Sequence, residues 1–325
     1  MRLAARLGAS LGGLLGRSRS GQVRRVLRVS RVVSDLARAE RFYTEGLGFS
    51  RIATAPLDPA LASALVSTLG QQGGGQYGSA DTVSLKLGGD EVVLVQWHDA
   101  GAAYPADSHS NDCWFQHLAI VVNDMAAAHA RVMRHAPRAI TTDGPQRLPP
   151  AVSQRVETAL GQGERAAAAG PAGTRVVAFK FRDPDGHPLE LIQFPPDQGR
   201  AVWHEHAGPG PCLGIDHSAL SVGSTPQSLR FYRGLGFRLA DRSFNHGPAQ
   251  AALDGLPGAQ VRVSSLRPAL DDGPGLELLG YLPPGRPVPA HDANAMLTDW
   301  VTLDTGGAAP PRVLRDPDGH LMVLV

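Results

Sequence analysis

Short alternating runs of hydrophobic and polar residues, separated by helical patterns, occur in the same order four times along the chain. The first unit covers residues 26–97. It begins with an apolar run at 29–33, continues with a helical pattern that Ser34 or Asp35 caps, and ends with two alternating strands. This order predicts a strand-helix-strand-strand-strand unit.

The other three units start at Phe115, Ile215 and near Met296. Units two and three each combine a strand, a helical pattern and a final alternating strand. In unit four, Pro310 and Pro311 stand where the helix would form, so we expect none there, because proline lacks the backbone N–H that a helix interior requires.

Two motifs show that the second half of the chain is a shortened copy of the first. FYTEGLGF at 42–49 recurs as FYRGLGF at 231–237, and RDPDGHPLELI at 182–192 recurs as RDPDGHLMVLV at 315–325. We expect the FY aromatic residues to anchor the core. Turn chemistry accounts for the DPDGH sequences, so His187 and His320 are predicted to be structural.

These helix ends and hairpins resemble the vicinal oxygen chelate superfamily, which includes glyoxalase I, bleomycin-binding proteins and extradiol dioxygenases. The resemblance covers residues 26–325. It implies an α+β fold in which four βαβββ units are paired into two cup-shaped mixed-sheet domains. Units one and two would form the first domain, at 26–197, and units three and four the second, at 214–325, with a linker at 198–213.

The resemblance also implies metal ligands at the start of the first strand and in the middle of the last strand of a unit. In unit two these positions hold His117 and Glu190, and in unit three they hold His217 and Glu277. A carboxylate within an apolar strand needs a partner, because an unpaired buried charge is costly. We therefore expect one His–Glu pair in each cup, with Asp299 as a weaker third ligand in the second.

The expected cofactor is a divalent ion of iron, manganese, zinc or nickel, with no metal as the alternative. Glu277 is also predicted to shuttle a proton as a catalytic group. Arg28, which matches His217 in position, is expected in the first cup, where it would pair with Glu190 or hold a substrate carboxylate. His246 is predicted either to contact substrate over the second cup or to lie in an exposed loop.

Composition narrows the class of protein. The 325 residues are 42% hydrophobic and 19% charged, with a net charge of +1, which is typical of a soluble globular protein and disfavours a strongly basic nucleic-acid binder. There is no apolar run long enough for a transmembrane helix. Residues 1–25 are rich in arginine and free of acids, which indicates a flexible basic leader on a cytoplasmic protein, with organelle targeting as the alternative.

The leading hypothesis is a divalent-metal-dependent enzyme of glyoxalase, isomerase or dioxygenase type that acts on a small oxygenated molecule. Extradiol cleavage is less favoured, since iron sites of that type use two histidines and a carboxylate, and unit four does not begin with a histidine. The alternative is a metal-free protein that sequesters a small molecule and has one degenerate cup. A homodimer is the expected assembly if the chain associates.

Overall fold

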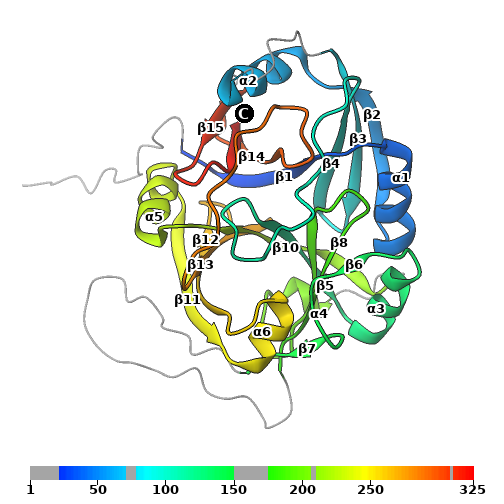
Figure 1. Ribbon diagram of the computed structural model, residues 1–325, viewed down its shortest axis with the longest axis vertical. Helices are drawn as coiled ribbons and strands as arrows, with labels where there is room; N and C mark the ends of the chain where they lie inside the picture. The colour runs from blue at the N-terminus through cyan, green and yellow to red at the C-terminus, as the bar shows by residue number, and fades with distance from the viewer. Residues whose placement is uncertain (1–21, 71–77, 150–174, 206–209, 308–309) are drawn as a thin grey trace, which may run out of the picture.

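The computed structural model describes residues 22–70, 78–149, 175–205, 210–307 and 310–325, and it contains two mixed β-sheets (Figure 1). Most of the basic leader predicted at 1–25 lies outside the described residues. The described part of the chain contains no helix that is both long and apolar enough to cross a membrane.

The first sheet has seven strands, in the order β15-β16-β14-β1-β4-β3-β2. It combines unit one with unit four. Its strands are β1 (Arg25–Val32), β2 (Ser50–Pro56), β3 (Ala80–Leu87), β4 (Asp90–Trp97), β14 (Asp299–Asp304), β15 (Arg312–Arg315) and β16 (Leu321–Leu324).

The second sheet has nine strands and combines unit two with unit three. Its order is β11-β12-β13-β10-β5-β9-β8-β6, and β7 pairs beside β6 on β8. Its strands are β5 (Gln116–Val122), β6 (Arg138–Ala139), β7 (Gln146–Arg147), β8 (Val177–Arg182), β9 (Pro188–Gln193), β10 (Cys212–Ser221), β11 (Arg238–His246), β12 (Gln260–Arg267) and β13 (Gly275–Tyr281).

The expected pairing of the units is therefore wrong, although the α+β class and the repeated units are confirmed. The first and last units share one sheet through the antiparallel pair β1–β14, and the two middle units share the other through β5–β10. Each sheet takes strands from both halves of the chain. The boundaries at 26–197, 198–213 and 214–325 stay a prediction.

The helices of the first three units form where the sequence predicts them. They are α1 (Leu36–Arg41), which continues as the π-helical turn η1 (Phe42–Gly46), α3 (Met125–Met133) and α5 (Thr225–Gly234). Asp35 and Asp124 accept hydrogen bonds from the N–H groups three residues later, which satisfies donors that a helix start leaves free. As expected, the described residues between β14 and β15 form no helix.

Three further helices, α2 (Pro59–Leu69), α4 (Val202–Glu205) and α6 (Pro248–Asp254), are additional to the predicted pattern. In Figure 1, α2 lies at the end of the molecule that holds β14 and β15, and α6 lies at the end that holds the nine-stranded sheet. Gly255 ends α6 in the left-handed conformation, and a Cβ there would lie 2.4 Å from the carbonyl oxygen of Ile140. Glycine thus permits the helix to pack against the chain before β7.

The main hydrophobic core joins both sheets to the helices α1, α3 and α5. It contains Val29 and Leu118 from the two sheets together with the aromatic residues Phe42, Tyr43 and Tyr232, all at most 3% exposed. The FY aromatic residues are confirmed as core anchors, with Phe231 packed at its edge. The face of each sheet that points away from this core is called the inner face below. The features that bear on function lie on these inner faces.

A cluster of buried charged residues connects the two sheets. Arg31 of β1 is fully buried and donates to the backbone oxygens of Gln116 and Pro188, at 3.4 and 3.0 Å. In the same cluster Asp183 lies 2.9 Å from the ring of His187, and both side chains are fully buried. Burial lowers the pKa of His187, but the carboxylates of Asp183 and Asp299 outweigh it and raise the pKa to about 9. The structural role predicted for His187 is confirmed.

We expect His187→Gln to lower the free energy of unfolding by about 2–3 kcal/mol near pH 6.5, where His187 is protonated in the folded chain. A raised pKa stabilises the fold below the unfolded value of about 6.5, and the contribution is lost as the pH rises through about 9. The difference between wild type and variant should therefore shrink between pH 6.5 and 9.5. Urea titrations across this range measure it.

The control is His98→Gln, because His98 is exposed and its two ring nitrogens contact the exposed residues Ser79 and Asp81. It should change the unfolding free energy by less than about 0.5 kcal/mol at every pH. A difference for His187→Gln that stays constant up to pH 9.5 would contradict the protonated buried pair.

Candidate metal centre

The two His–Glu pairs meet on the inner face of the nine-stranded sheet, at one place rather than in two cups. The strands that carry them are neighbours, in the order β13-β10-β5-β9. Ala119 pairs with Glu190 and Ala219 with Glu277, while each histidine lies opposite the alanine of the other strand. Because side chains alternate along a strand, residues two apart share a face. The register therefore gathers all four side chains.

The polar atoms of this cluster are close together. His117 Nε2 is 3.1 Å from Glu190 Oε2, and that oxygen is 3.9 Å from His217 Nε2. His217 Nε2 is also 3.4 Å from Glu277 Oε2. One ligand atom from each of His117, Glu190 and His217 lies within 4.8 Å of the other two. Two ligands about 2.1 Å from one ion are about 3.0–3.4 Å apart at octahedral or tetrahedral angles, so these separations suit a shared ion.

The ionisable side chains of this cluster are mostly buried, which is unusual if their role is only structural. His117, Glu190 and His217 are 2%, 5% and 5% exposed, and the Glu277 side chain is more open, at 22%. Among the described residues, neither ring nitrogen of His117 has an aligned hydrogen-bond partner, although Glu190 is near. Buried polar atoms are normally paired, so an orphaned imidazole that faces two carboxylates and a second imidazole fits a metal ligand.

The two histidines have opposite pKa shifts, because burial dominates at His117 and neighbouring carboxylates dominate at His217. Burial, together with Lys180, lowers the pKa of His117 to about 4, so its imidazole is neutral and offers a lone pair. Burial also acts on His217, but Glu277, Asp216 and Glu190 outweigh it and raise its pKa to about 9. Burial opposes ionisation of Glu190, yet His117 and Lys180 lower its pKa to about 2. Glu190 is thus an ionised ligand at neutral pH.

Asp216 fixes the orientation of His217 through the ring nitrogen Nδ1, and Trp203 in turn holds Asp216. Asp216 Oδ2 is 3.0 Å from His217 Nδ1, and Asp216 Oδ1 accepts a hydrogen bond of 2.9 Å from the Trp203 indole. Burial opposes ionisation of Asp216, but these bonds lower its pKa to about 2, so Nδ1 must be the donor. That leaves His217 Nε2 directed at the cluster, and carboxylates commonly orient metal-binding histidines in this way, through the ring nitrogen that does not bind the ion.

Glu277 has a partner on the neighbouring strand. Ser265 Oγ donates a hydrogen bond of 2.6 Å to Glu277 Oε1, which fixes the carboxylate and leaves Oε2 toward His217. Neither Ser265 nor Asp216 follows from the sequence pattern. Asp216 is next to His217 and would ordinarily point to the other face, but the register of β10 shifts between Ile215 and His217. Such an irregularity re-aims a side chain.

A buried ion pair lies beside the cluster. Lys180 of β8 is directly opposite Glu190 in the sheet, and its Nζ is 2.7 Å from Oδ1 of Asp254, the last residue of α6. Both side chains are at most 4% exposed. Burial lowers the pKa of Lys180, but Asp254 and Glu190 outweigh this and raise it. The pair therefore fastens α6 over the inner face and places a positive charge near Glu190.

The seven-stranded sheet has no comparable ligand set among its described residues. Thr302 pairs with Val323 as Ala119 pairs with Glu190, so Trp300 and Val323 stand where the histidine and glutamate would be. Ser30 pairs with Val93 as Ala219 pairs with Glu277. Trp300, Val323 and Val93 belong to an apolar cluster that covers this face.

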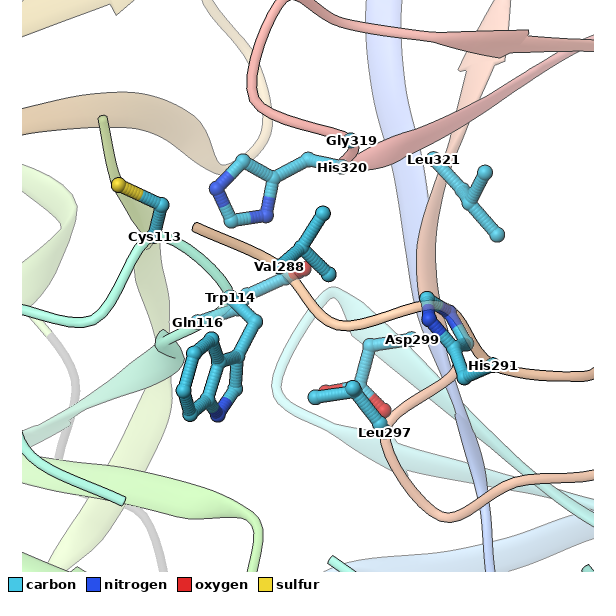
Figure 2. A pocket seen from close by; sticks show the side chains of 10 residues that line it. All are labelled: Cys113, Trp114, Gln116, Val288, His291, Leu297, Asp299, Gly319, His320 and Leu321. Atoms are coloured by element: carbon cyan, nitrogen blue, oxygen red, sulfur yellow. The ribbon is translucent and has the colours of Figure 1, made fainter. Parts of the chain in front are cut away.

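The structure does not bring Asp299 to the metal centre. Asp299 lies in β14, one residue before Trp300, with Arg31 and His187 at 3.5 and 3.6 Å. It borders a cavity of about 20 Å³, which has room for about one water molecule (Figure 2). The residues around this cavity come from the starts of β5, β14 and β16 and from the segments just before these strands. A role for Asp299 as ligand is not supported by this placement.

The two predicted substrate residues also lie apart from the cluster. Arg28 is in the seven-stranded sheet, partly exposed and 3.8 Å from Glu91, so it does not face Glu190 as expected. His246 ends β11 at the edge of the nine-stranded sheet, where it is exposed and its ring lies 5.2 Å from that of Phe244. Its contact with substrate stays a prediction.

The class of protein follows from the repeated units, the two mixed sheets and this cluster. A sequence model of the Glyoxalase/Bleomycin resistance protein/Dioxygenase superfamily matches residues 25–191, about half of the chain, and the protein belongs to this superfamily. The resemblance found in the sequence is confirmed. A search of curated proteins finds no match.

Solved structures share the fold at low sequence identity. Glyoxalase I from Zea mays is 17% identical, with a TM-score of 0.53, and the match covers 93% of this chain and 92% of the maize chain. A dioxygenase-like protein from Bacillus subtilis is 12% identical, with a TM-score of 0.52 and coverage of 93% and 85%. At this identity, the likeness shows the fold and not the activity.

Proposed function

We propose that the protein is a divalent-metal-dependent enzyme with a single active site at His117, Glu190, His217 and Glu277, and that it moves a proton on a small oxygenated molecule. The observation that carries this proposal is the convergence of two buried histidines and two carboxylates from four neighbouring strands. Imidazole and carboxylate ligands suit iron, manganese, zinc and nickel.

The side chains have distinct roles in this proposal. His117, Glu190 and His217 would hold the ion, and Glu277 would complete the set. When bound, the ion would polarise adjacent oxygen atoms of a substrate and make a neighbouring C–H more acidic. Glu277 is the most exposed of the four, and Ser265 fixes its Oε1, so its Oε2 is placed to accept the substrate proton and return it.

Proton transfer is favoured over oxygen chemistry by the second carboxylate. The sequence disfavoured a dioxygenase because unit four offers no histidine, but the structure supplies both histidines and one carboxylate from units two and three. That triad suits non-haem iron oxygenases as well. Glu277, 3.4 Å from His217, adds a fourth group that such a triad does not need and that proton transfer does.

Hydrogen–deuterium exchange tests the reaction type. Hydroxyacetone carries adjacent oxygens, and NMR in D₂O follows exchange at its carbons. Protein loaded in turn with Mn²⁺, Fe²⁺, Ni²⁺ or Zn²⁺ should accelerate exchange, and Glu277→Gln should lower the rate at least about 100-fold. Glu91→Gln, outside the site, is the control. Exchange that survives chelation would contradict the proposal, and oxygen uptake with catechol instead of exchange would assign the dioxygenase type.

The apolar inner face of the seven-stranded sheet supports the expectation that one of the two cups is degenerate. Its cluster includes Leu65 of α2 and Trp300 of β14, both at most 1% exposed, so side chains fill the place of a site. We infer that this half of the molecule serves stability. Assembly as a homodimer and a cytoplasmic location stay predictions.

A further inference from the structure

A cavity of about 530 Å³ opens where strands β5 and β9 end and β8 begins, and its volume lies in the range of small-molecule sites. Val121, Phe194 and Trp203 form part of its wall. The same three residues pack together in an apolar cluster that lines the inner face of the nine-stranded sheet. The cavity therefore offers an apolar surface on the same face as the metal centre.

One chain of contacts links the wall of this cavity to the metal centre. Trp203 borders the cavity and donates to Asp216, which in turn holds His217. Val121 lies four residues after His117 on the same face of β5, at a separation of about 13 Å along the strand. The cavity therefore lies beside the metal centre on the same face of the sheet, although none of the four cluster residues is among those that line it.

The charge of the cavity is positive. Arg147 and Arg175 both border it, together with His204, and no aspartate or glutamate is among the residues that line it. Both arginines are exposed, and neither forms an ion pair with any residue in the described ranges. Guanidinium groups without a protein partner are suited to bind a carboxylate, often through two parallel hydrogen bonds.

We propose that this cavity binds an organic carboxylate whose apolar body lies against Phe194 and Trp203 and whose carboxylate is held by Arg147 and Arg175. The opposite, oxygenated end of the molecule reaches the four-residue cluster, and this last part rests on the proposed function. The cavity would then select the substrate by charge while the cluster carries out the chemistry.

Calorimetric titration of the full-length, metal-free protein tests the charge selection with two matched ligands, 4-phenylbutyrate and the neutral 4-phenylbutan-1-ol. The wild type should bind the carboxylate at least tenfold more tightly than the alcohol. The double variant Arg147→Gln/Arg175→Gln should weaken binding of the carboxylate at least tenfold and change that of the alcohol less than twofold. Phe194→Ala should weaken both ligands to a similar extent.

The matched control is Arg242→Gln/Arg262→Gln, which removes two positive charges from strands β11 and β12 at the other edge of the same sheet. It should leave both affinities unchanged. No binding of 4-phenylbutyrate to wild type, or equal losses in the two double variants, would overturn the proposal. Because the titration uses metal-free protein, its failure is separate from a failure of metal binding or proton exchange.

Discussion

Glu190→Gln is expected to abolish metal binding, which is the largest single effect on the site. Glu190 Oε2 lies between the two histidines, 3.1 Å from His117 Nε2 and 3.9 Å from His217 Nε2. An amide has nearly the same shape but carries no charge, and its oxygen is a far weaker ligand for a divalent ion. Metal affinity should fall at least about 100-fold, measured by titration of the metal-free protein and elemental analysis.

Glu91→Gln is the matched control for this substitution. It makes the same chemical change in β4 of the other sheet, where Glu91 faces Arg28 at 3.8 Å and is partly exposed. It should retain the full metal content. If Glu190→Gln also keeps a full complement of metal while it stays folded, the ion is held elsewhere and the assignment of Glu190 is wrong.

Asp254→Asn should destabilise the fold by about 3–5 kcal/mol, because it leaves the ammonium group of Lys180 buried without its counter-charge. Asp254 is also the last residue of α6, so the substitution removes a contact that holds this helix in place. Gln250 donates to Asp254 Oδ2 at 2.7 Å, so the carboxylate serves two buried donors. Urea unfolding, followed by circular dichroism, gives the difference in free energy.

The double variant Lys180→Met/Asp254→Leu separates the cost of an unpaired charge from that of lost packing. Removal of both charges should recover most of the stability, since apolar replacements of a buried pair are often neutral or stabilising. A single variant Asp254→Asn within about 0.5 kcal/mol of the wild type would show that the pair is not buried in solution.

The sequence predicted the units and the residues of the site better than their arrangement. The resemblance to the vicinal oxygen chelate superfamily indicates His117, Glu190, His217 and Glu277 as candidate ligands, and alternation along a strand shows which residues share a face. It does not show which strand is the neighbour. Two separate His–Glu pairs were expected because consecutive units were assumed to share a sheet, whereas β5 of unit two pairs with β10 of unit three.

Register explains the errors at single residues. Asp299 was expected as a ligand, but the pairing of Thr302 with Val323 puts Trp300 on the inner face and Asp299 on the other. A shift of one residue moves every side chain to the opposite face, and a sequence pattern rarely fixes register to that accuracy. The support from Asp216 depends on an irregularity in β10, and irregularities of this kind have no clear sequence signal.

The number of metal ions per chain tests the central claim most directly. Elemental mass spectrometry on untagged protein, purified without chelator, should find one equivalent of a divalent metal. His117→Ala and His217→Ala, each on a different half of the chain, should each remove all of it. Two ions per chain, with each variant losing one, would contradict a single shared site, and a protein that binds no divalent metal would favour metal-free sequestration of a small molecule.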